Sequence, residues 1–238
     1  MKTIVSIGQK GGAGKTTLLL AIAAAAHEVG LKVVIADLDP ESSNASLWFQ
    51  RRKQFESSKL PYVVASNISA LPNLKETLRI EGIDLFLIDT PPLSSSTPVE
   101  AAEQADLILM PCRISALDLD AMKKTKRLSD LANCAPHTEK YAVLIEVPCT
   151  GYKREQEVRE ALLKIGLPVL GGGLGDRVIF GDSYGAGQTV IEYDAKDKGT
   201  NECKSLFEHV RSLDCMKSNI LEREKADEEE ECEVLSHG

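Results

Sequence analysis

The residues best suited to chemistry form a glycine-rich segment close to the N-terminus. It reads Lys10-Gly11-Gly12-Ala13-Gly14-Lys15-Thr16-Thr17. Its glycines let backbone N–H groups turn toward an anion, and a helix that begins near Lys15 adds the positive end of its dipole. Lys15 offers a point charge to the β- and γ-phosphates of a nucleotide, and the Thr16 hydroxyl suits Mg²⁺, which prefers oxygen ligands. The segment predicts a phosphate-binding loop rather than a merely flexible turn.

The loop departs from the ordinary phosphate-loop pattern at its first position. The pattern Gly-x-x-x-x-Gly-Lys-[Ser/Thr] needs a glycine at position 9, where this chain has Gln9. A second lysine, Lys10, stands directly before Gly11 and Gly12. A solvated loop lysine is the plain interpretation of Lys10, but its place before the two glycines favours a functional role.

Three aspartates follow hydrophobic runs that we predict to be buried strands. Asp37 and Asp39 come after residues 32–36, and Asp89 comes after residues 83–88. The carboxyl ends of parallel strands share one edge of a sheet, where ligands bind. At that edge Asp89 suits the water shell of Mg²⁺, and Asp39 suits positioning an attacking water. Asp37 has a second interpretation, as the cap of a helix or turn.

The elements that must position these side chains alternate along the chain between strands and helices. This alternation predicts an α/β fold, a doubly wound, mostly parallel sheet with helices on both faces. The expected strands are 3–8, 32–36, 61–65, 83–88, 107–110, 141–147 and 167–170, with a further extended piece at 189–193. The expected helices are 16–29, 71–80, 117–131, 154–165 and 199–221.

Composition sets the remaining limits on the class of protein. The chain has 238 residues, is 43% hydrophobic and 5% aromatic, and contains six cysteines without a Cys-x-x-Cys pair. No apolar run is long enough to span a membrane, so we expect a cytoplasmic protein with reduced thiols. Residues 222–233 carry −6 of the net charge of −8, which leaves −2 for the rest. We therefore expect one ATPase domain over residues 1–221, followed by an acidic, disordered tail over 222–238.

These motifs resemble the ParA/MinD group of deviant Walker ATPases, a subclass of the P-loop NTPases, and within it the small ParA-type partition proteins. The resemblance covers roughly residues 1–210. Besides the loop, it rests on segments 37–40, 87–92, 105–113 and 115–119.

The resemblance implies a slow, Mg²⁺-dependent ATP hydrolase that acts as an ATP-dependent homodimer. Lys10 matches the lysine that reaches the partner subunit's nucleotide, whereas Lys15 acts within its own subunit. Asp39 matches the carboxylate of hydrolysis. Thr16 and, through water, Asp89 match the metal site. The implied nucleotide-binding residues are Gly11, Gly12, Ala13, Gly14, Lys15, Thr16, Thr17 and Pro148.

Such proteins bind DNA nonspecifically in the ATP state and associate with the nucleoid. A ParB-like or functionally equivalent adaptor stimulates hydrolysis, and the system segregates a plasmid or chromosome. Arg177 and Lys204 lie in the segments where the family places DNA contacts, so we expect them to contact DNA. Two other basic clusters, 51–53 and 123–127, are further candidates, although such clusters are usually solvated helix faces.

One departure from the family concerns the base of the nucleotide. The family commonly has Asn where this chain has Glu146, and a carboxylate can accept from the adenine amino group but cannot donate to a ring nitrogen. How adenine is recognised is therefore open.

Two alternative functions remain open at this stage. One is a ParA-like ATPase that positions a protein cargo instead of DNA. The other is a MinD-like, membrane-associated division-site ATPase, and the acidic C-terminus argues against it because anionic lipid would repel it. An iron–sulfur reductase ATPase is disfavoured because residues 90–111 contain no cysteine.

Overall fold

The computed structural model describes residues 1–53, 61–92, 95–150 and 152–217. These residues form one parallel sheet of seven strands in the order β3-β2-β4-β1-β5-β6-β7. The strands are β1 (Lys2–Ser6), β2 (Val33–Asp37), β3 (Tyr62–Ala65), β4 (Leu85–Asp89), β5 (Leu107–Cys112), β6 (Glu139–Val147) and β7 (Val169–Gly175). Since all strands run the same way, the carboxyl ends of β1, β2 and β4 meet at one edge.

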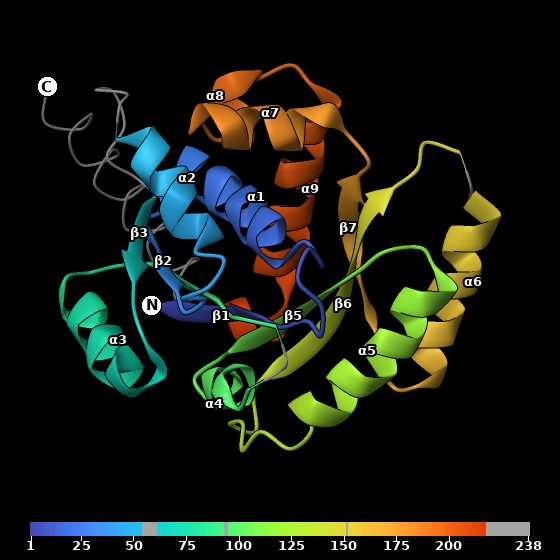
Figure 1. Cartoon of the computed structure of the whole chain (residues 1–238), viewed down its shortest axis with the longest axis horizontal. Coiled ribbons are helices and arrows are strands. Elements are labelled where there is room, and N and C mark those ends of the chain that lie inside the picture. The colour runs from blue at the N-terminus through green and yellow to red at the C-terminus, as the bar shows by residue number, and fades with distance from the viewer. Residues whose placement is uncertain (54–60, 93–94, 151, 218–238) are drawn as a thin grey trace, which may run out of the picture.

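Helices cover both faces of this sheet (Figure 1). One face is covered by α1 (Lys15–Glu28), α2 (Asn44–Arg52), α7 (Val178–Ala186), α8 (Val190–Tyr193) and α9 (Lys198–Ser212). The other is covered by α3 (Leu71–Ile80), α4 (Thr97–Ala102), α5 (Ala116–Ser129) and α6 (Tyr152–Lys164). Short 3₁₀ turns occur at Ile68–Ala70 and Asp214–Met216. The predicted doubly wound α/β fold is confirmed.

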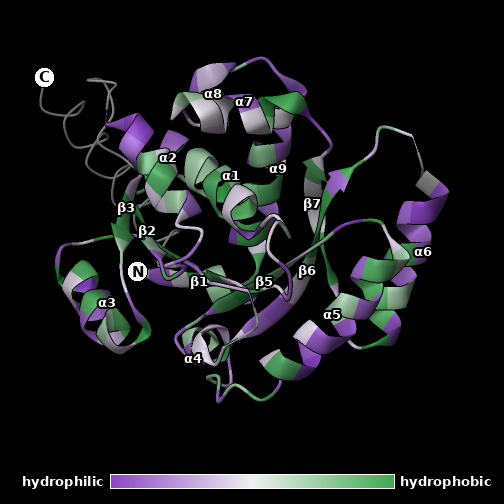
Figure 2. Ribbon diagram, in the orientation of Figure 1, coloured by the Kyte–Doolittle hydropathy of each residue, from purple (hydrophilic) through white to green (hydrophobic). Residues whose placement is uncertain are grey.

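The core consists of two hydrophobic layers separated by the sheet. Strand β4 shows the principle: Leu85 and Leu87 join the layer beneath α1 and α9, whereas Phe86 and Ile88 join the layer beneath α3, α4, α5 and α6. All four side chains are buried because successive residues of a strand point to opposite faces. Figure 2 shows that α5 and α6 carry both hydrophobic and hydrophilic residues, as helices that cover a sheet do.

The last strand differs from the prediction. We expected it over 167–170, but β7 is Val169–Gly175 and so includes the glycine run. The glycines belong to the strand because other atoms approach it closely. A Cβ at Gly173 would lie 2.6 Å from the backbone oxygen of Leu144, and Gly172 has a φ of +73°. The run therefore reflects close packing and irregular pairing with β6 rather than the end of the sheet.

Two C-terminal expectations were wrong. The piece expected to be extended, 189–193, contains the helix α8, because the Thr189 side chain and Glu192 form a capping box. The closing helix ends at Ser212, since Leu213 is extended (φ −67°, ψ 145°). Residues 218–221 of that expectation, and the acidic segment 222–238, lie outside the described residues. Helices α2, α4 and α7 were not anticipated.

The cysteines of the described residues are free thiols. Cys112, Cys203 and Cys215 are buried, and burial raises the pKa of each thiol to about 12. Cys134 is half-buried and Cys149 is exposed. Within the described ranges, none of the helices has the length and apolar character needed to cross a bilayer.

Candidate active site

The phosphate loop connects β1 to α1 and depends on glycine at two positions. Gly12 and Gly14 have φ angles of +71° and +81°, which only glycine adopts without strain. A Cβ atom at Gly14 would also collide with Cδ1 of Ile145. The Gly14 carbonyl accepts the first helical hydrogen bond of α1, from the Leu18 N–H. The loop thus leads directly into a helix N-terminus, as a phosphate site requires.

The two lysines of the loop lie in different environments. Lys15 is buried (6% exposed), whereas the Lys10 side chain is 53% exposed and its Nζ lies 4.0 Å from Oδ1 of Asp118. Burial lowers the pKa of Lys15, and the negative charges of Asp89 and Asp39 oppose this shift. Lys15 therefore faces the carboxylates of the sheet edge, while Lys10 is accessible from outside.

Thr16 and Asp89 form the part of the site that fits a metal ion. The Thr16 hydroxyl donates a 2.6 Å hydrogen bond to Oδ2 of Asp89, and Oδ1 of Asp89 is buried without a hydrogen-bond partner among the described residues. Burial, chiefly, raises the pKa of Asp89 to about 7. An unsatisfied buried carboxylate oxygen beside a hydroxyl suits a hydrated Mg²⁺.

The remaining ligands of such an ion would come from the nucleotide and water. In the described part of the chain no group of three His, Cys, Asp or Glu side chains is placed to hold a metal by itself. This is the usual condition of Mg²⁺ in phosphate-transferring sites, where the ion keeps several waters and binds substrate oxygens.

The two aspartates at the carboxyl end of β2 have different roles. Asp37 caps α2, because its Oδ2 accepts from the N–H and hydroxyl of Ser46 at 2.9 and 2.8 Å. The interpretation of Asp37 as the cap of a helix is therefore correct. Oδ1 of Asp39 accepts from the N–H groups of Glu41 and Ser42 at 3.1 and 3.0 Å, which fixes its carboxylate near Lys15.

A cavity of about 360 Å³ opens beside the loop. It is bounded by the loop and α1, by the ends of β6 and β7, and by residues of α2 and α7. Its lining residues are Gly14, Thr16, Thr17, Asn44, Ile145, Glu146, Leu174, Gly175, Asp176, Arg177, Phe180, Gly181 and Tyr184. The sequence motifs did not point to Asn44, Phe180 or Tyr184, because the helices that carry them were not predicted. Pro148 is not among the lining residues, so its role stays a prediction.

Comparison with known proteins gives the family of this chain. Residues 4–190 match the CobQ/CobB/MinD/ParA nucleotide binding domain (CbiA). The chain belongs to this family. It is a ParA/MinD-type P-loop ATPase, as its motifs predicted.

The individual relatives share about a quarter or less of their aligned residues with this chain. IncC of Escherichia coli is 25% identical over 256 residues, which cover 88% of this chain and 69% of IncC. The chromosome-partitioning ATPase Soj of Thermus thermophilus is 27% identical over 146 residues, 51% of this chain and 59% of Soj. Among solved structures, the septum site-determining protein MinD of Pyrococcus horikoshii OT3, complexed with Mg-ADP, aligns with a TM-score of 0.70 at 19% identity, over 92% of this chain and 99% of MinD. The similarity to this MinD structure is a similarity of fold.

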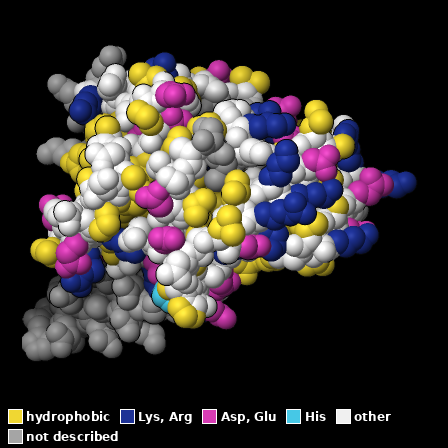
Figure 3. Space-filling view, turned by 60° about the horizontal axis from the view of Figure 1, so that its bottom comes forward, with side chains coloured by type: hydrophobic (Ala, Val, Ile, Leu, Met, Phe, Trp, Pro, Cys, Tyr) yellow, Lys and Arg dark blue, Asp and Glu magenta, His cyan; other side chains and the backbone are white. Residues whose placement is uncertain are grey.

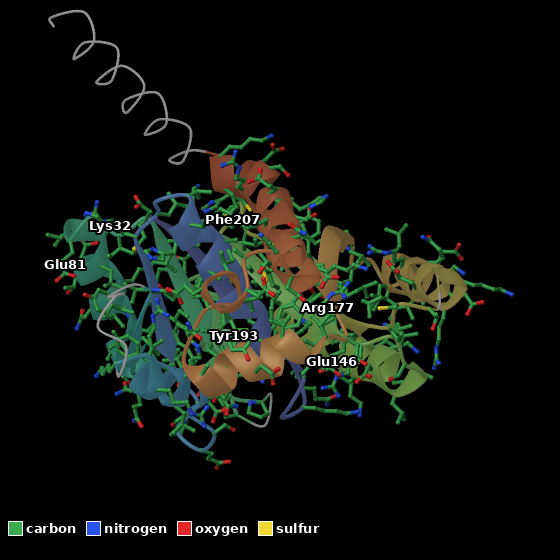
Figure 4. The ribbon with its side chains drawn as sticks, turned by 90° about the horizontal axis from the view of Figure 1, so that it is seen from above. Lys32, Glu81, Glu146, Arg177, Tyr193 and Phe207 are labelled. Atoms are coloured by element: carbon green, nitrogen blue, oxygen red, sulfur yellow. The ribbon has the colours of Figure 1, made fainter. Side chains whose placement is uncertain are left out.

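Glu146, near the end of β6, combines an unusual backbone conformation with an ion pair. Its backbone is left-handed (φ +49°), a conformation that Asn adopts more readily than Glu. Its Oε1 accepts a 2.6 Å hydrogen bond from Nη2 of Arg113. Figure 4 shows Glu146 and Arg177 near the N-terminal end of α7. No sequence motif indicated the contact with Arg113, because the two residues are 33 positions apart.

The two residues expected to contact DNA both form ion pairs in this ParA/MinD ATPase. Arg177 donates through Nε and Nη2 to Oε1 of Glu202 at 2.8 and 2.6 Å. Nζ of Lys204 lies 2.7 Å from Oε1 of Glu28. Arg52, from the cluster 51–53, is 3% exposed and therefore unsuited to a solvent-facing DNA contact.

Proposed function

We propose that this chain is an ATP-dependent dimer switch of a partition system. In the ATP state it dimerises and binds DNA nonspecifically, and an adaptor protein stimulates its slow hydrolysis. The names of its relatives support this proposal, since Soj is a chromosome-partitioning ATPase. The adaptor is ParB-like or functionally equivalent, and the cargo is a plasmid or chromosome.

The observation that carries the proposal is the different burial of the two loop lysines. Lys15 is enclosed within its own subunit, whereas 53% of the Lys10 side chain is exposed on the outer side of the same loop. An exposed lysine beside a phosphate site is able to contact the nucleotide of a second copy of the chain. ATP would then join two subunits, and hydrolysis would release them.

ATP and Mg²⁺ are the proposed ligands. The MinD structure with Mg-ADP supports this choice, as does the buried, unsatisfied Oδ1 of Asp89 next to the Thr16 hydroxyl. Thr16 and Asp89 would hold the ion directly or through water. Lys15 would bind the β- and γ-phosphates, and Asp39 would orient the attacking water.

Two surfaces are candidates for the proposed DNA contact. Arg177 and Lys204 would have to exchange Glu202 and Glu28 for DNA phosphates. Lys and Arg side chains also gather on the side of the molecule formed by α5 and α6 (Figure 3). The exposed basic residues of these two helices are Lys123, Lys124, Arg127, Lys153, Arg154 and Lys164.

A DNA-retention assay tests the proposal. The protein is passed over immobilised duplex DNA with ATP, ADP or no nucleotide, at 50 and 300 mM salt. We expect retention with ATP alone, with a steep loss at the higher salt because phosphate contacts release counterions. Equal retention with ADP, or none with ATP at low salt, would contradict the DNA-bound switch.

Charge variants then identify the surface that contacts DNA. The pair Lys124→Glu and Arg127→Glu is compared with the pair Arg177→Glu and Lys204→Glu, and the pair that abolishes retention while preserving ATP binding marks the interface. A parallel arm with anionic vesicles addresses the MinD-like alternative, since ATP-dependent sedimentation with vesicles and not with DNA would favour it.

A further inference from the structure

Arg113 links the phosphate loop to the end of β6. It directly follows β5, and its Nη2 donates to the backbone oxygen of Gly12 at 2.7 Å and to Oε1 of Glu146 at 2.6 Å. The distances are those of strong, charge-assisted hydrogen bonds. One guanidinium nitrogen thus bridges two segments that are far apart in the sequence.

Peptide geometry turns the contact with Gly12 into a constraint on the loop. The peptide between Gly12 and Ala13 is planar and trans, so its C=O and N–H point in opposite directions. When Arg113 holds the Gly12 oxygen, the Ala13 N–H must be directed away from the guanidinium. Arg113, Gly12 and Ala13 line a small hollow with Lys10, whereas Gly14, Thr16 and Thr17 line the large cavity. Arg113 therefore contacts the loop from the side of Lys10.

The constraint matters because Gly12 would otherwise be free to rotate. Glycine loses more backbone freedom than any other residue when it is fixed, and Gly12 has a φ of +71° with no atom within 4 Å of its Cβ position. No neighbouring atom lies close to this position to restrain it, whereas the hydrogen bond from Arg113 to the Gly12 oxygen does restrain the orientation of the peptide.

Glu146 holds Arg113 in place. Both side chains are partly exposed, 42% for Arg113 and 47% for Glu146, so the guanidinium would have other rotamers without its partner. Glu146 lies in the wall of the cavity beside the loop and has a left-handed backbone. One of its carboxylate oxygens, Oε1, is engaged by Arg113.

We propose that Arg113 is a positioning residue of the phosphate loop, oriented by Glu146, which presents the Ala13 N–H to a nucleotide phosphate. The inference rests on the proposed nucleotide site and deepens it. Glu146, where the family commonly has Asn, serves here as the anchor of Arg113 rather than as a reader of the base.

Arg159 offers a matched control for the test. It also joins a glutamate and a backbone carbonyl, since it bonds Oε1 of Glu155 at 2.9 Å and the Leu170 oxygen at 3.5 Å. It belongs to α6 and does not line the cavity beside the loop. Arg159→Gln therefore removes a similar set of interactions without touching the loop.

The experiment measures dissociation constants of ATP and of inorganic tripolyphosphate by titration calorimetry, with melting temperatures of the free proteins. We expect Arg113→Gln to weaken both ligands about tenfold, as loss of a hydrogen bond from a charged group predicts. Arg159→Gln should change them less than about twofold. Glu146→Gln should weaken binding by about threefold, and the double variant should match Arg113→Gln, because the two residues act as a unit.

Each outcome decides the inference. If Arg113→Gln binds tripolyphosphate like Arg159→Gln at a similar melting temperature, the positioning role is overturned while the nucleotide site stands. If the wild-type protein binds neither ligand, the proposed function fails together with it. If Arg113→Gln does not fold, Glu146→Gln replaces it, and its affinity for both ligands is compared with that of the wild-type protein at low and at high salt. Unchanged affinity in Glu146→Gln overturns the inference.

Discussion

The Thr16 hydroxyl donates a 2.6 Å hydrogen bond to Oδ2 of Asp89, although 73 positions separate the two residues in the sequence. They meet because β1 and β4 are neighbouring parallel strands in which Ser6 pairs with Asp89, so that the loop after β1 passes over the end of β4. Each of these oxygens suits Mg²⁺, and their contact brings them to one place before any ion binds.

Removal of the Thr16 hydroxyl should uncouple nucleotide binding from Mg²⁺. We expect the ATP affinity of Thr16→Ala in the presence of Mg²⁺ to fall by about tenfold, because a hydrogen bond to a charged group and a metal ligand are lost together. Thr16→Ser keeps the hydroxyl and should retain most of the affinity. ATP titrations with and without Mg²⁺ measure the difference, and equal Mg²⁺ dependence in all three proteins would contradict the assignment.

Asp39→Asn should separate hydrolysis from binding. The amide oxygen can still accept from the N–H groups of Glu41 and Ser42, so the turn is kept, but the negative charge beside the attacking water is lost. We expect ATP affinity within about threefold of wild type and turnover at least about tenfold slower. Phosphate release under single-turnover conditions measures this, and unchanged turnover would remove Asp39 from catalysis.

Lys10→Ala should bind ATP but fail to dimerise. Its side chain is exposed and does not close its own phosphate site, whereas Lys15 is buried in that site. Light scattering with Mg²⁺ and a slowly hydrolysed ATP analogue measures the mass. Lys15→Ala is the contrasting variant, since it should lose nucleotide binding itself. A Lys10→Ala protein that still forms the ATP-dependent dimer would refute the role in the second subunit.

The ion pair between Arg52 and Glu192 predicts a pH dependence of stability. Burial acts in the opposite direction, but hydrogen bonds from Arg52 and Thr189 lower the pKa of Glu192 from 4.5 to about 2. A carboxyl group with a lowered pKa in the folded state stabilises the fold above its ordinary pKa, and this contribution is lost as the pH falls from 4.5 to about 2.

Denaturant unfolding of Glu192→Gln checks this prediction. The difference in unfolding free energy from wild type should be constant above about pH 5 and should shrink toward pH 2. Glu160→Gln, on the exposed side of α6, serves as the control with no such trend. A difference that grows in acid would show that the sign is wrong.

Gly173→Ala should destabilise the protein by about 1–3 kcal/mol, the usual cost of overpacking. The added Cβ would lie 2.6 Å from the Leu144 backbone oxygen, which belongs to the neighbouring strand and cannot easily move. Gly181→Ala is the matched control, because no atom lies within 4 Å of its Cβ and alanine favours the helix α7. Thermal melting of both variants measures the difference, and equal melting temperatures would contradict the close approach.

The sequence alone determined the loop, the strands that flank it and the family. Lys15 and Thr16 are contiguous with the glycines, and the run 83–88 is hydrophobic enough to be recognised as a buried strand, which the structure places at Leu85–Asp89, so local pattern was sufficient. The α8 helix could also have been found, because the spacing of Thr189 and Glu192 is that of a capping box. The glycines of β7 misled the prediction, since what they permit is an approach by Leu144 from another strand.

Only the tertiary structure decided which polar groups meet. The cap that Asp37 forms on Ser46, the pairing of Arg177 with Glu202 and the bridge from Arg113 to Gly12 and Glu146 each join residues from separate elements. A side chain's type states which bonds it is able to make, but its partner is set by the order of strands in the sheet. The phosphate loop is thus readable from the chain itself, whereas the residues that hold it in shape are not.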